Sequence, residues 1–227
     1  YTCFGANIEA ALLGLMLPAA TSMRSLSVDG HALQIDELKG TKPTEKIVLA
    51  RKGLNVAHTI IIASCIKGNG VLKELNLRNN HIGGNGASKI AAVLKETVIS
   101  ELNLLDNSIG DEGAFALAAV LKETQITKLD LGLNNIGSAG ASALAAILKE
   151  TQITSLGLEC NQLGPKGGAA IAECLKGNST LQSLDLQANQ LCGLDYRGDG
   201  TYTTEGITKL CEALKGSAVT SLNLFGN

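Results

Sequence analysis

Aromatic side chains are scarce in this sequence: its 227 residues include no tryptophan, three phenylalanines and three tyrosines. Hydrophobic residues nevertheless make up 45% of the chain. A buried core must therefore consist mainly of Leu, Ile, Val and Ala, packed as many small side chains. Proline is also rare, with 3 residues against 26 glycines, so the turns depend on flexible backbone rather than on proline rings.

The usual signs of nucleic-acid binding, metal binding and catalysis are missing as well. The formal net charge is −2, which provides no basic surface for nucleic acid. There is no CxxC pair and no histidine at zinc-ligand spacing, and His31, His58 and His81 are isolated along the chain. No GxSxG motif, P-loop or carboxylate cluster occurs. We therefore predict no nucleic-acid partner, no metal, no cofactor and no catalytic residue, and we expect that the protein is not an enzyme.

One apolar stretch, AALLGLMLPAA at 10–20, superficially resembles the core of a signal peptide. It lacks a basic flank, follows Glu9 and is too short to span a bilayer, so it predicts an amphipathic capping helix and no membrane insertion. Cys65 and Cys174 occupy equivalent places in two helical segments and are expected to be small buried apolar residues. Reduced thiols favour an intracellular, cytoplasmic location. An organelle stays open, because the sequence starts at Tyr1 and a targeting segment could precede it.

The sequence repeats itself with a period of about 27 residues. The segment 98–124 is followed at once by a near copy at 125–151. Repeat units start near residues 47, 75, 102, 129, 156, 184 and 222, and the last step is longer because a loop is inserted at 192–206. We therefore divide the chain into an N-terminal capping region at 1–46, with a helix and a degenerate half-repeat, and repeats at 47–227.

Each repeat has a first half with strand periodicity and a second half with helix periodicity. Apolar residues alternate in LDL at 129–131, and they recur at helical spacing in 140–149. A glycine pair opens each helix, Asp111 and Ser138 are the expected N-caps, and Pro165 fits a first helical turn. Strands stack about 4.8 Å apart, whereas helices need about 10 Å. The pattern thus predicts an α/β solenoid, or horseshoe, with a parallel sheet on the concave side and helices on the convex side.

A position that recurs in the repeats, three residues after the second strand leucine, carries asparagine. Backbone groups in a turn at this point are buried but lie outside the sheet, and each unpaired group costs about 1–3 kcal/mol. An amide side chain offers both donors and an acceptor, so a stacked row of amides joins one turn to the next. This structural ladder is predicted to consist of Asn80, Asn107, Asn134, Asn161 and Asn189.

The pattern LxxLxLxxNxIGxxGAxALAxxL resembles leucine-rich repeats of the ribonuclease-inhibitor type, which also occur in Nod-like receptors and in the Ran GTPase-activating protein. The resemblance covers 47–227 and is strongest over 71–191. It implies a horseshoe that binds proteins through the concave sheet and neighbouring loops. Two departures stand out: Lys52 replaces the asparagine of the first unit, and the alternation of two unit types found in ribonuclease inhibitor is missing.

Alternate strand residues face the concave side, and they vary between units whose framework hardly changes. Such variation fits a surface used for recognition, and it also fits plain solvent exposure. Leu105, Leu133 and Phe225 are the best apolar anchors, because interfaces concentrate binding energy in few contacts. The candidate partner-binding residues of this face are Glu74, Asn76, Arg78, Glu101, Asn103, Leu105, Lys128, Asp130, Leu133, Glu159, Asp185, Gln187 and Phe225.

The inserted loop at 191–206 is the second candidate surface. It is about eleven residues longer than the equivalent segment 163–167, and long loops of repeat proteins often lie on the binding side. Part of it is similar to a calcium-binding loop, but an arginine and a glycine stand where ligands are needed, so no calcium site is predicted. A tolerated surface insertion is the alternative. The candidate loop residues are Asp195, Tyr196, Arg197, Asp199 and Tyr202.

Together these patterns predict a non-enzymatic scaffold that binds a protein partner of unknown identity, alone or in a large complex, through the concave face and the 191–206 loop. The main alternative is a peripheral structural subunit built permanently into a larger assembly. A third hypothesis, suggested by the Ran-activating relative, is regulation of an enzyme through a loop arginine. Arg51, Arg78 and Arg197 are the candidates for that role.

Overall fold

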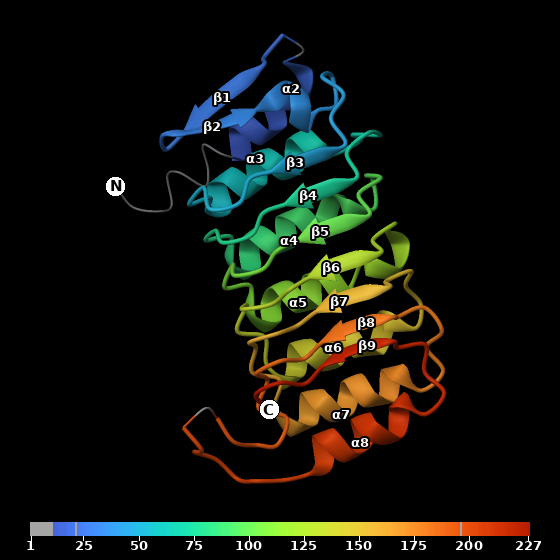
Figure 1. The fold of residues 1–227 in the computed structure, drawn as a ribbon. Helices are drawn as coiled ribbons and strands as arrows, with labels where there is room; N and C mark the ends of the chain where they lie inside the picture. The colour runs from blue at the N-terminus through green and yellow to red at the C-terminus, as the bar shows by residue number, and fades with distance from the viewer. Residues whose placement is uncertain (1–10, 21, 196) are drawn as a thin grey trace.

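The repeats stack side by side in the computed structural model, which describes residues 11–20, 22–195 and 197–227. The strands form one seven-stranded parallel sheet whose order is their order in the sequence (Figure 1). Equivalent leucines are paired in register, for example Leu102 with Leu129. The strands are β3 (Lys46–Val48), β4 (Glu74–Asn76), β5 (Glu101–Asn103), β6 (Lys128–Asp130), β7 (Ser155–Gly157), β8 (Ser183–Asp185) and β9 (Ser221–Asn223).

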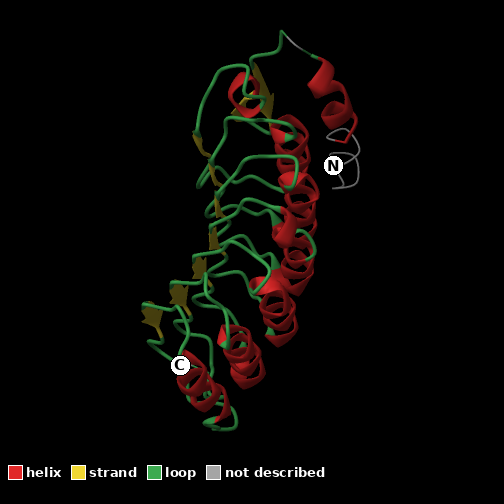
Figure 2. Cartoon of the chain, turned by 90° about the vertical axis from the view of Figure 1, so that its right-hand side faces the viewer, coloured by secondary structure: helices red, strands yellow, loops and turns green. Residues whose placement is uncertain are grey.

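A second layer of helices covers one face of this sheet. Figure 2 shows the strands in one row and the helices in another, with the stack curving so that the helices lie on its outer side. The predicted α/β solenoid is therefore confirmed. The helices are α3 (Val56–Ile66), α4 (Gly83–Leu94), α5 (Gly110–Ala118), followed by the 3-10 turn η2 (Leu121–Glu123), α6 (Ser138–Leu148), α7 (Gly164–Leu175) and α8 (Glu205–Leu214).

The N-terminal region packs onto the first repeat. Residues 11–16 are helical and lead into the 3-10 turn η1 (Leu17–Ala19), and an antiparallel hairpin of β1 (Ser25–Val28) and β2 (His31–Gln34) precedes the short helix α2 (Ile35–Leu38). Leu17, Leu33 and Leu38 are buried in the same core as the repeat leucines, which supports our proposal that 1–46 caps the repeats. Among the described residues, no helix combines the length and apolar content needed to cross a membrane.

The asparagine ladder connects each turn to its neighbours through hydrogen bonds. Asn134 Oδ1 accepts the backbone N–H groups of Asn107 and Ile109 in the preceding repeat, at 3.0 and 3.2 Å. Its Nδ2 donates to the carbonyl groups of Leu104 and Gly132, both at 2.9 Å. The side chain is fully buried. One amide thus makes four hydrogen bonds to backbone groups, and it is the partner of two N–H groups that lie outside the sheet.

The ladder differs in two respects from the predicted row. Asn227 is a further member that the sequence interpretation missed: its Oδ1 accepts the N–H groups of Asn189 and Leu191, at 2.9 and 3.3 Å. The spacing after Leu222 and Leu224 would have identified it. In addition, the buried Oδ1 atoms of Asn107 and Asn189 have no hydrogen-bond partner within the described chain, so these two amides contribute mainly as donors.

The two positions that open each helix require glycine for different reasons. The first glycine has a positive φ in three repeats, for example +62° at Gly110, where a side chain would be strained. The second lies where adjacent helices approach closely. A Cβ at Gly113 would collide with Ile109 Cγ2 and lie 3.0 Å from Ala87 Cβ on α4, and Gly140 has the same relation to Ala114 on α5. The small residues therefore set the helix spacing on the convex side.

The predicted N-caps are wrong. Asp111 lies inside the first turn of α5, and its Oδ1 accepts the N–H groups of Gly137 and Gly140 at 2.8 and 2.9 Å. It therefore caps α6, the helix of the next repeat, where an anion is also favoured by the helix dipole. Ser138 is the first residue of α6, and no side chain caps that helix from within its own repeat. Pro165 does lie in the first turn of α7.

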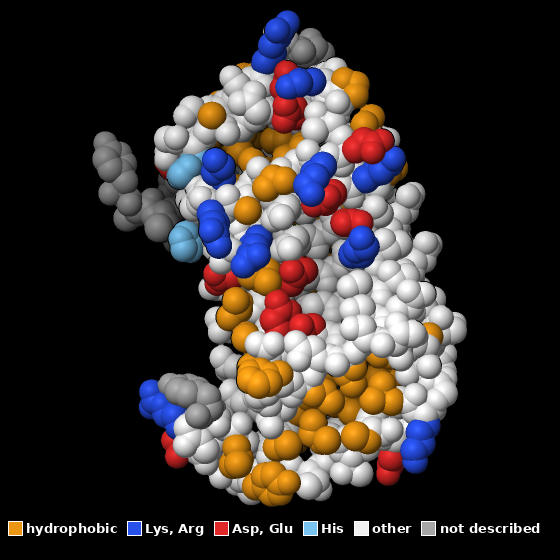
Figure 3. Space-filling view, viewed as in Figure 1, with side chains coloured by type: hydrophobic (Ala, Val, Ile, Leu, Met, Phe, Trp, Pro, Cys, Tyr) orange, Lys and Arg blue, Asp and Glu red, His pale blue; other side chains and the backbone are white. Residues whose placement is uncertain are grey.

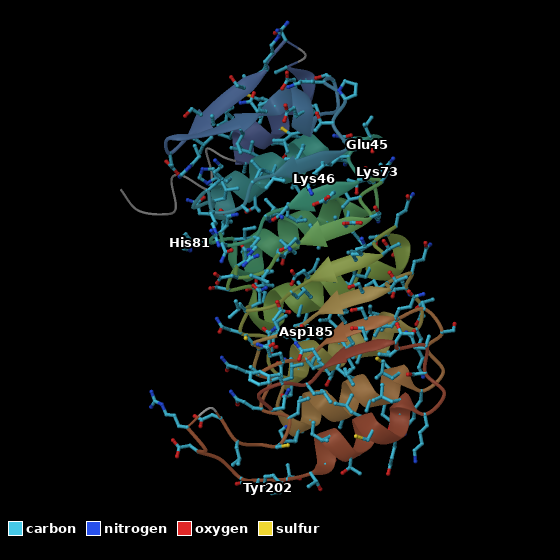
Figure 4. All side chains as sticks on the ribbon, in the orientation of Figure 1. Glu45, Lys46, Lys73, His81, Asp185 and Tyr202 are labelled. Atoms are coloured by element: carbon cyan, nitrogen blue, oxygen red, sulfur yellow. The ribbon has the colours of Figure 1, made fainter. Side chains whose placement is uncertain are left out.

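Two of the histidines that are isolated along the chain meet in the fold. The hairpin folds back over α3, so the rings of His31 and His58 pack edge to face with centroids 5.6 Å apart. His58 is fully buried; its Nε2 lies 3.1 Å from the carbonyl oxygen of Val28, and its Nδ1 accepts the N–H group of Asn55 at 3.3 Å. His58 therefore joins the hairpin to the first repeat. His81 is exposed at the edge of the sheet (Figure 4).

Replacing Asn134 with Ala should lower the free energy of unfolding by about 3 kcal/mol, because it leaves the buried N–H groups of Asn107 and Ile109 unpaired and removes one hydrogen bond from each of two carbonyl groups. Urea unfolding followed by circular dichroism measures the change. Gln152→Ala, at an exposed position, is the control and should alter stability by less than about 0.5 kcal/mol. Equal stability of the two variants would contradict the structural role of the ladder.

Replacing Gly113 with Ala should destabilise the protein by about 1–3 kcal/mol, because the added methyl group overpacks the contact between α4 and α5. Thermal melting is the readout. Gly70→Ala makes the same chemical change at a site with no atom within 4 Å, and should leave the melting temperature unchanged or slightly raised. A neutral Gly113→Ala variant would show that the helices tolerate wider spacing.

Candidate functional site

The concave face of the sheet forms an open groove of about 400 Å³. Figure 3 shows lysine and arginine side chains over the N-terminal half of this face and acidic side chains near its centre. Strands β4 to β8 supply the lining, which places side chains from five repeats in one continuous surface. The lining residues are Glu74, Asn76, Glu101, Leu102, Asn103, Lys128, Leu129, Asp130, Ser155, Leu156, Gly157, Glu159, Ser183 and Asp185.

Most of the predicted concave residues are brought together here. The lining includes the predicted Glu74, Asn76, Glu101, Asn103, Lys128, Asp130, Glu159 and Asp185. Arg78 and Gln187 lie beside the groove at the ends of their strands, where Arg78 Nε donates to Asn79 Oδ1 at 2.7 Å. Alternation along each strand explains the arrangement, because every second side chain points to the same face.

The N-terminal half of the groove has its charges paired within the chain. Glu74 forms an ion pair with Lys46 at 2.8 Å, and Glu101 forms one with Lys128 at 2.7 Å. Both pairs join neighbouring strands at equivalent positions. Lys46 was not among the predicted site residues, although its place 28 residues before Glu74 marks it as the equivalent position of the first repeat. Figure 4 shows Lys46 on this part of the sheet.

The centre of the groove contains three carboxylates around a glycine. A Cβ at Gly157 would lie 2.9 Å from Asp130 Oδ1 and 3.1 Å from Glu159 Oε2, and Asp185 follows on the next strand, paired in register with Gly157. A Cβ at Gly132 would likewise collide with the Glu159 carboxylate. The Glu159 carboxylate therefore lies over Gly132, and the Asp130 and Glu159 carboxylates border the space over Gly157. Charges of the same sign gather at one point of the surface.

Burial raises the pKa of both Asp130 and Glu159. For Asp130, the loss of hydration outweighs the hydrogen bond from the Gly132 N–H, the attraction of Arg78 and the amide of Asn103. For Glu159, the loss of hydration is again the largest cause, and the neighbouring charges of Asp130 and Asp185 raise its pKa further. Ionised carboxylates here are less stable than in water.

The three predicted apolar anchors differ in exposure. Phe225 and Leu133 are 77% and 45% exposed, so they are available to a partner. Leu105 is only 7% exposed and contributes little to the surface, which contradicts its selection as an anchor. Leu133 has φ of +55°, like the residues at the equivalent turn position of other repeats, and this left-handed backbone turns its side chain outward at the sheet edge.

The 191–206 loop lies apart from the groove. None of its described residues lines the groove, and Figure 4 shows Tyr202 at the lower end of the molecule, below the part of the sheet that carries Asp185. The loop closes on itself: Leu194 and Gly200 form a bridge, and Asp195 Oδ1 accepts the N–H groups of Arg197 and Asp199, both at 2.9 Å. Tyr202 is 63% exposed. The predicted Tyr196 lies outside the described residues.

The cysteine thiols of the described residues do not suggest a catalytic reaction. Burial raises the pKa of the Cys65 thiol to about 11 and that of Cys174 to about 12, so both are uncharged apolar side chains, as predicted. Within the part of the chain that the structure describes, no three histidine, cysteine, aspartate or glutamate side chains are grouped so as to hold a metal ion.

A curved solenoid with an open, unpartnered sheet defines the class of protein: a repeat protein of the α/β type. Comparison with known families identifies the repeats, because a family model described as "Leucine Rich repeat" matches residues 68–91, 97–118, 124–145 and 151–172. The chain thus carries leucine-rich repeats. A comparison with curated proteins found no match.

The fold is also found among solved structures. One that matches is "Leiomodin-1 Actin-Binding Site 2 (ABS2)", with a TM-score of 0.51 and 23% sequence identity. The match covers 62% of this chain and 78% of the leiomodin chain. At this level of identity the likeness concerns the fold.

Replacing Asp130 with Asn should raise the melting temperature at pH 7. The pKa of Asp130 is raised from its ordinary value of 3.8, so the folded protein binds more protons than the unfolded chain between 3.8 and the raised value. The free energy of unfolding therefore falls as the pH rises from 3.8 to the raised pKa. The destabilisation by the Asp130 carboxylate is complete above this range and absent below 3.8. The gain from Asp130→Asn should accordingly shrink as the pH is lowered to about 3.

Glu173→Gln on α7 is the matched control for this measurement. The hydrogen bond and charge of Lys176 lower the pKa of Glu173, which is the opposite direction, and the side chain is exposed. Its removal should leave the melting temperature at pH 7 unchanged or slightly lower. If Asp130→Asn also lowered it, the carboxylate would be stabilising in the unbound protein.

Proposed function

We propose that this protein is a non-enzymatic scaffold that binds a protein partner through the concave face and the 191–206 loop. The observation that carries the proposal is the open groove: five adjacent strands present polar and charged side chains on a sheet face that the chain itself does not cover. A fixed framework with a variable exposed face suits recognition of another protein. Because the loop does not line the groove, the two would be separate contact regions on one partner.

The comparisons support a protein as the partner. Leucine-rich repeats are generally protein-binding scaffolds, and the solved relative is named for an actin-binding site. We propose that the repeats are of the ribonuclease-inhibitor type, on the basis of the LxxLxLxxN pattern and the helix in each unit. We also propose an intracellular, cytoplasmic setting: every cysteine of the described residues, including Cys65 and Cys174, is a free thiol, which is typical of reducing compartments.

A permanent place in a larger assembly is the second candidate function. Gel filtration of the purified chain separates the two functions, because a stable monomer argues against an obligate subunit.

Site-specific photo-crosslinking in an extract of the native source tests the proposed surface. A benzophenone amino acid at Ser155 in the groove, and one at Tyr202 in the loop, should each crosslink the same protein, identified by mass spectrometry. The same probe at Ser142, exposed on the helical side, should not crosslink it. Crosslinking from Ser142 but not from Ser155 would place the binding surface on the convex side and overturn the proposal.

A further inference from the structure

At the centre of the groove, the space over Gly157 holds no side chain of its own strand and is bordered by carboxylates; this space is called the hollow below. The last position of each strand, from β3 to β9, carries in order Val48, Asn76, Asn103, Asp130, Gly157, Asp185 and Asn223. Gly157 is the member of this row without a side chain, and its register partners on the two sides are Asp130 and Asp185. The carboxylate of Glu159 bounds the hollow on a third side. The sheet therefore presents a gap framed by three acids.

These three carboxylates are only partly neutralised within the chain. Among the described residues, ion pairs form at Glu74 and Glu101 in the same groove, but none forms at Asp130, Glu159 or Asp185. Neutral amides serve instead: Asn103 Nδ2 donates to Asp130 at 2.9 Å, and Asn223 Nδ2 donates to Asp185 at 3.0 Å. Arg78 attracts Asp130 and Glu159 without an ion pair to either. The centre of the face is left with an excess of negative charge and reduced hydration.

The exposed aromatic ring of Phe225 lies on the same face, two strands away from Gly157. β9 is adjacent to β8, Asn223 is the register partner of Asp185, and Phe225 follows Asn223 at the next position that faces the groove. Phe225 is 77% exposed. Its ring offers apolar contact area beside the acidic hollow.

Resting on the function proposed above, we propose that the concave face docks a basic segment of the partner protein, with an arginine or lysine side chain entering the hollow over Gly157 and an apolar side chain packing on Phe225. A guanidinium or ammonium group has the charge and the hydrogen-bond donors that the three carboxylates lack. Binding of this cation is favourable because it relieves the repulsion among the three carboxylates. Acidic surfaces such as nucleic acids and anionic membranes are repelled by the same groups.

A model peptide tests the charge requirement directly. The probe is a fluorescein-labelled peptide of alternating arginine, glycine and phenylalanine, and its counterpart has citrulline, a neutral isostere, in place of arginine. Fluorescence anisotropy at low salt should show binding of the arginine peptide and loss of about tenfold or more in affinity for the citrulline peptide. Equal affinity for both peptides would overturn the proposal.

Two triple variants with the same change of net charge locate the binding. Asp130→Asn, Glu159→Gln and Asp185→Asn together should weaken binding of the arginine peptide by about tenfold or more. Glu123→Gln, Glu150→Gln and Glu212→Gln together, at exposed helical positions, should change affinity by less than about twofold. An equal loss in both would show that only the overall charge matters and would overturn the proposed site.

A substitution that fills the hollow distinguishes a loss of peptide binding from a loss of folding, because the melting temperature is measured as well. Gly157→Lys places a cation of the chain among the three carboxylates; it should raise the melting temperature and abolish peptide binding. Gly157→Gln fills the same space without charge, so it should block the peptide without the same gain in stability. Unimpaired binding to Gly157→Lys would show that the peptide binds elsewhere.

The crosslinking experiment separates this inference from the proposed function. If the partner crosslinks from Ser155 with equal yield in the parent and in the Asp130, Glu159 and Asp185 triple variant, the groove binds a partner but not through a basic segment. If no partner crosslinks from Ser155 in the parent, the proposed function itself fails. If the partner crosslinks from Ser155 in the parent but not in the groove triple variant, the result supports both the proposed function and the basic segment.

Discussion

Hydrogen bonding between successive turns is the constraint on which the rest of the structure depends. A parallel sheet of three-residue strands pairs few backbone groups, and most of each repeat lies outside it. Asparagine amides such as that of Asn134 supply the missing partners and hold neighbouring turns in register. Only with the turns fixed do the leucines of adjacent strands align into one core and the small residues of adjacent helices meet.

This framework separates the requirements of stability from those of recognition. Buried positions such as Leu129 and Asn134 are set by the stacking, whereas the alternate strand positions face the groove and are free to differ. The chain uses that freedom unevenly. Glu101 and Lys128 neutralise each other on adjacent strands, while Asp130, Glu159 and Asp185 crowd together around Gly157. A half-buried group of like charges weakens the isolated protein, so its presence fits a surface that contacts something else.

Much of the fold was accessible from the sequence because its causes are periodic. Residues 27 apart must occupy equivalent places, so the sheet, its register and the buried leucines followed from spacing alone. What the spacing could not provide were contacts between repeats that depend on side-chain length and direction. Asp111 was assigned to its own helix, yet its carboxylate reaches the helix of the following repeat. The His31–His58 contact depends on how a hairpin outside the repeats folds back.

The groove was predictable as a set of positions but not as a surface with a particular chemistry. Strand alternation identified Asp130, Glu159 and Asp185 as neighbours on one face. Leu105 and Leu133 occupy different places in the repeat: Leu133 is equivalent to Asp106 at the turn with positive φ, whereas Leu105 is equivalent to Gly132. Their difference in burial therefore follows the repeat, although the sequence interpretation treated them alike. The separation of the 191–206 loop from the groove could not be predicted in this way, because the loop folds on itself through the side chain of Asp195.

The ladder has a direction, and this has a consequence for synthesis on the ribosome. The N–H of Asn107 is satisfied by the oxygen of Asn134, 27 residues further along the chain, and Asn134 in turn depends on Asn161. A newly translated repeat therefore stays incomplete until the next has left the exit tunnel. The growing chain therefore always carries one unfinished unit at its C-terminal end, next to the ribosome, and consolidation follows translation one repeat at a time.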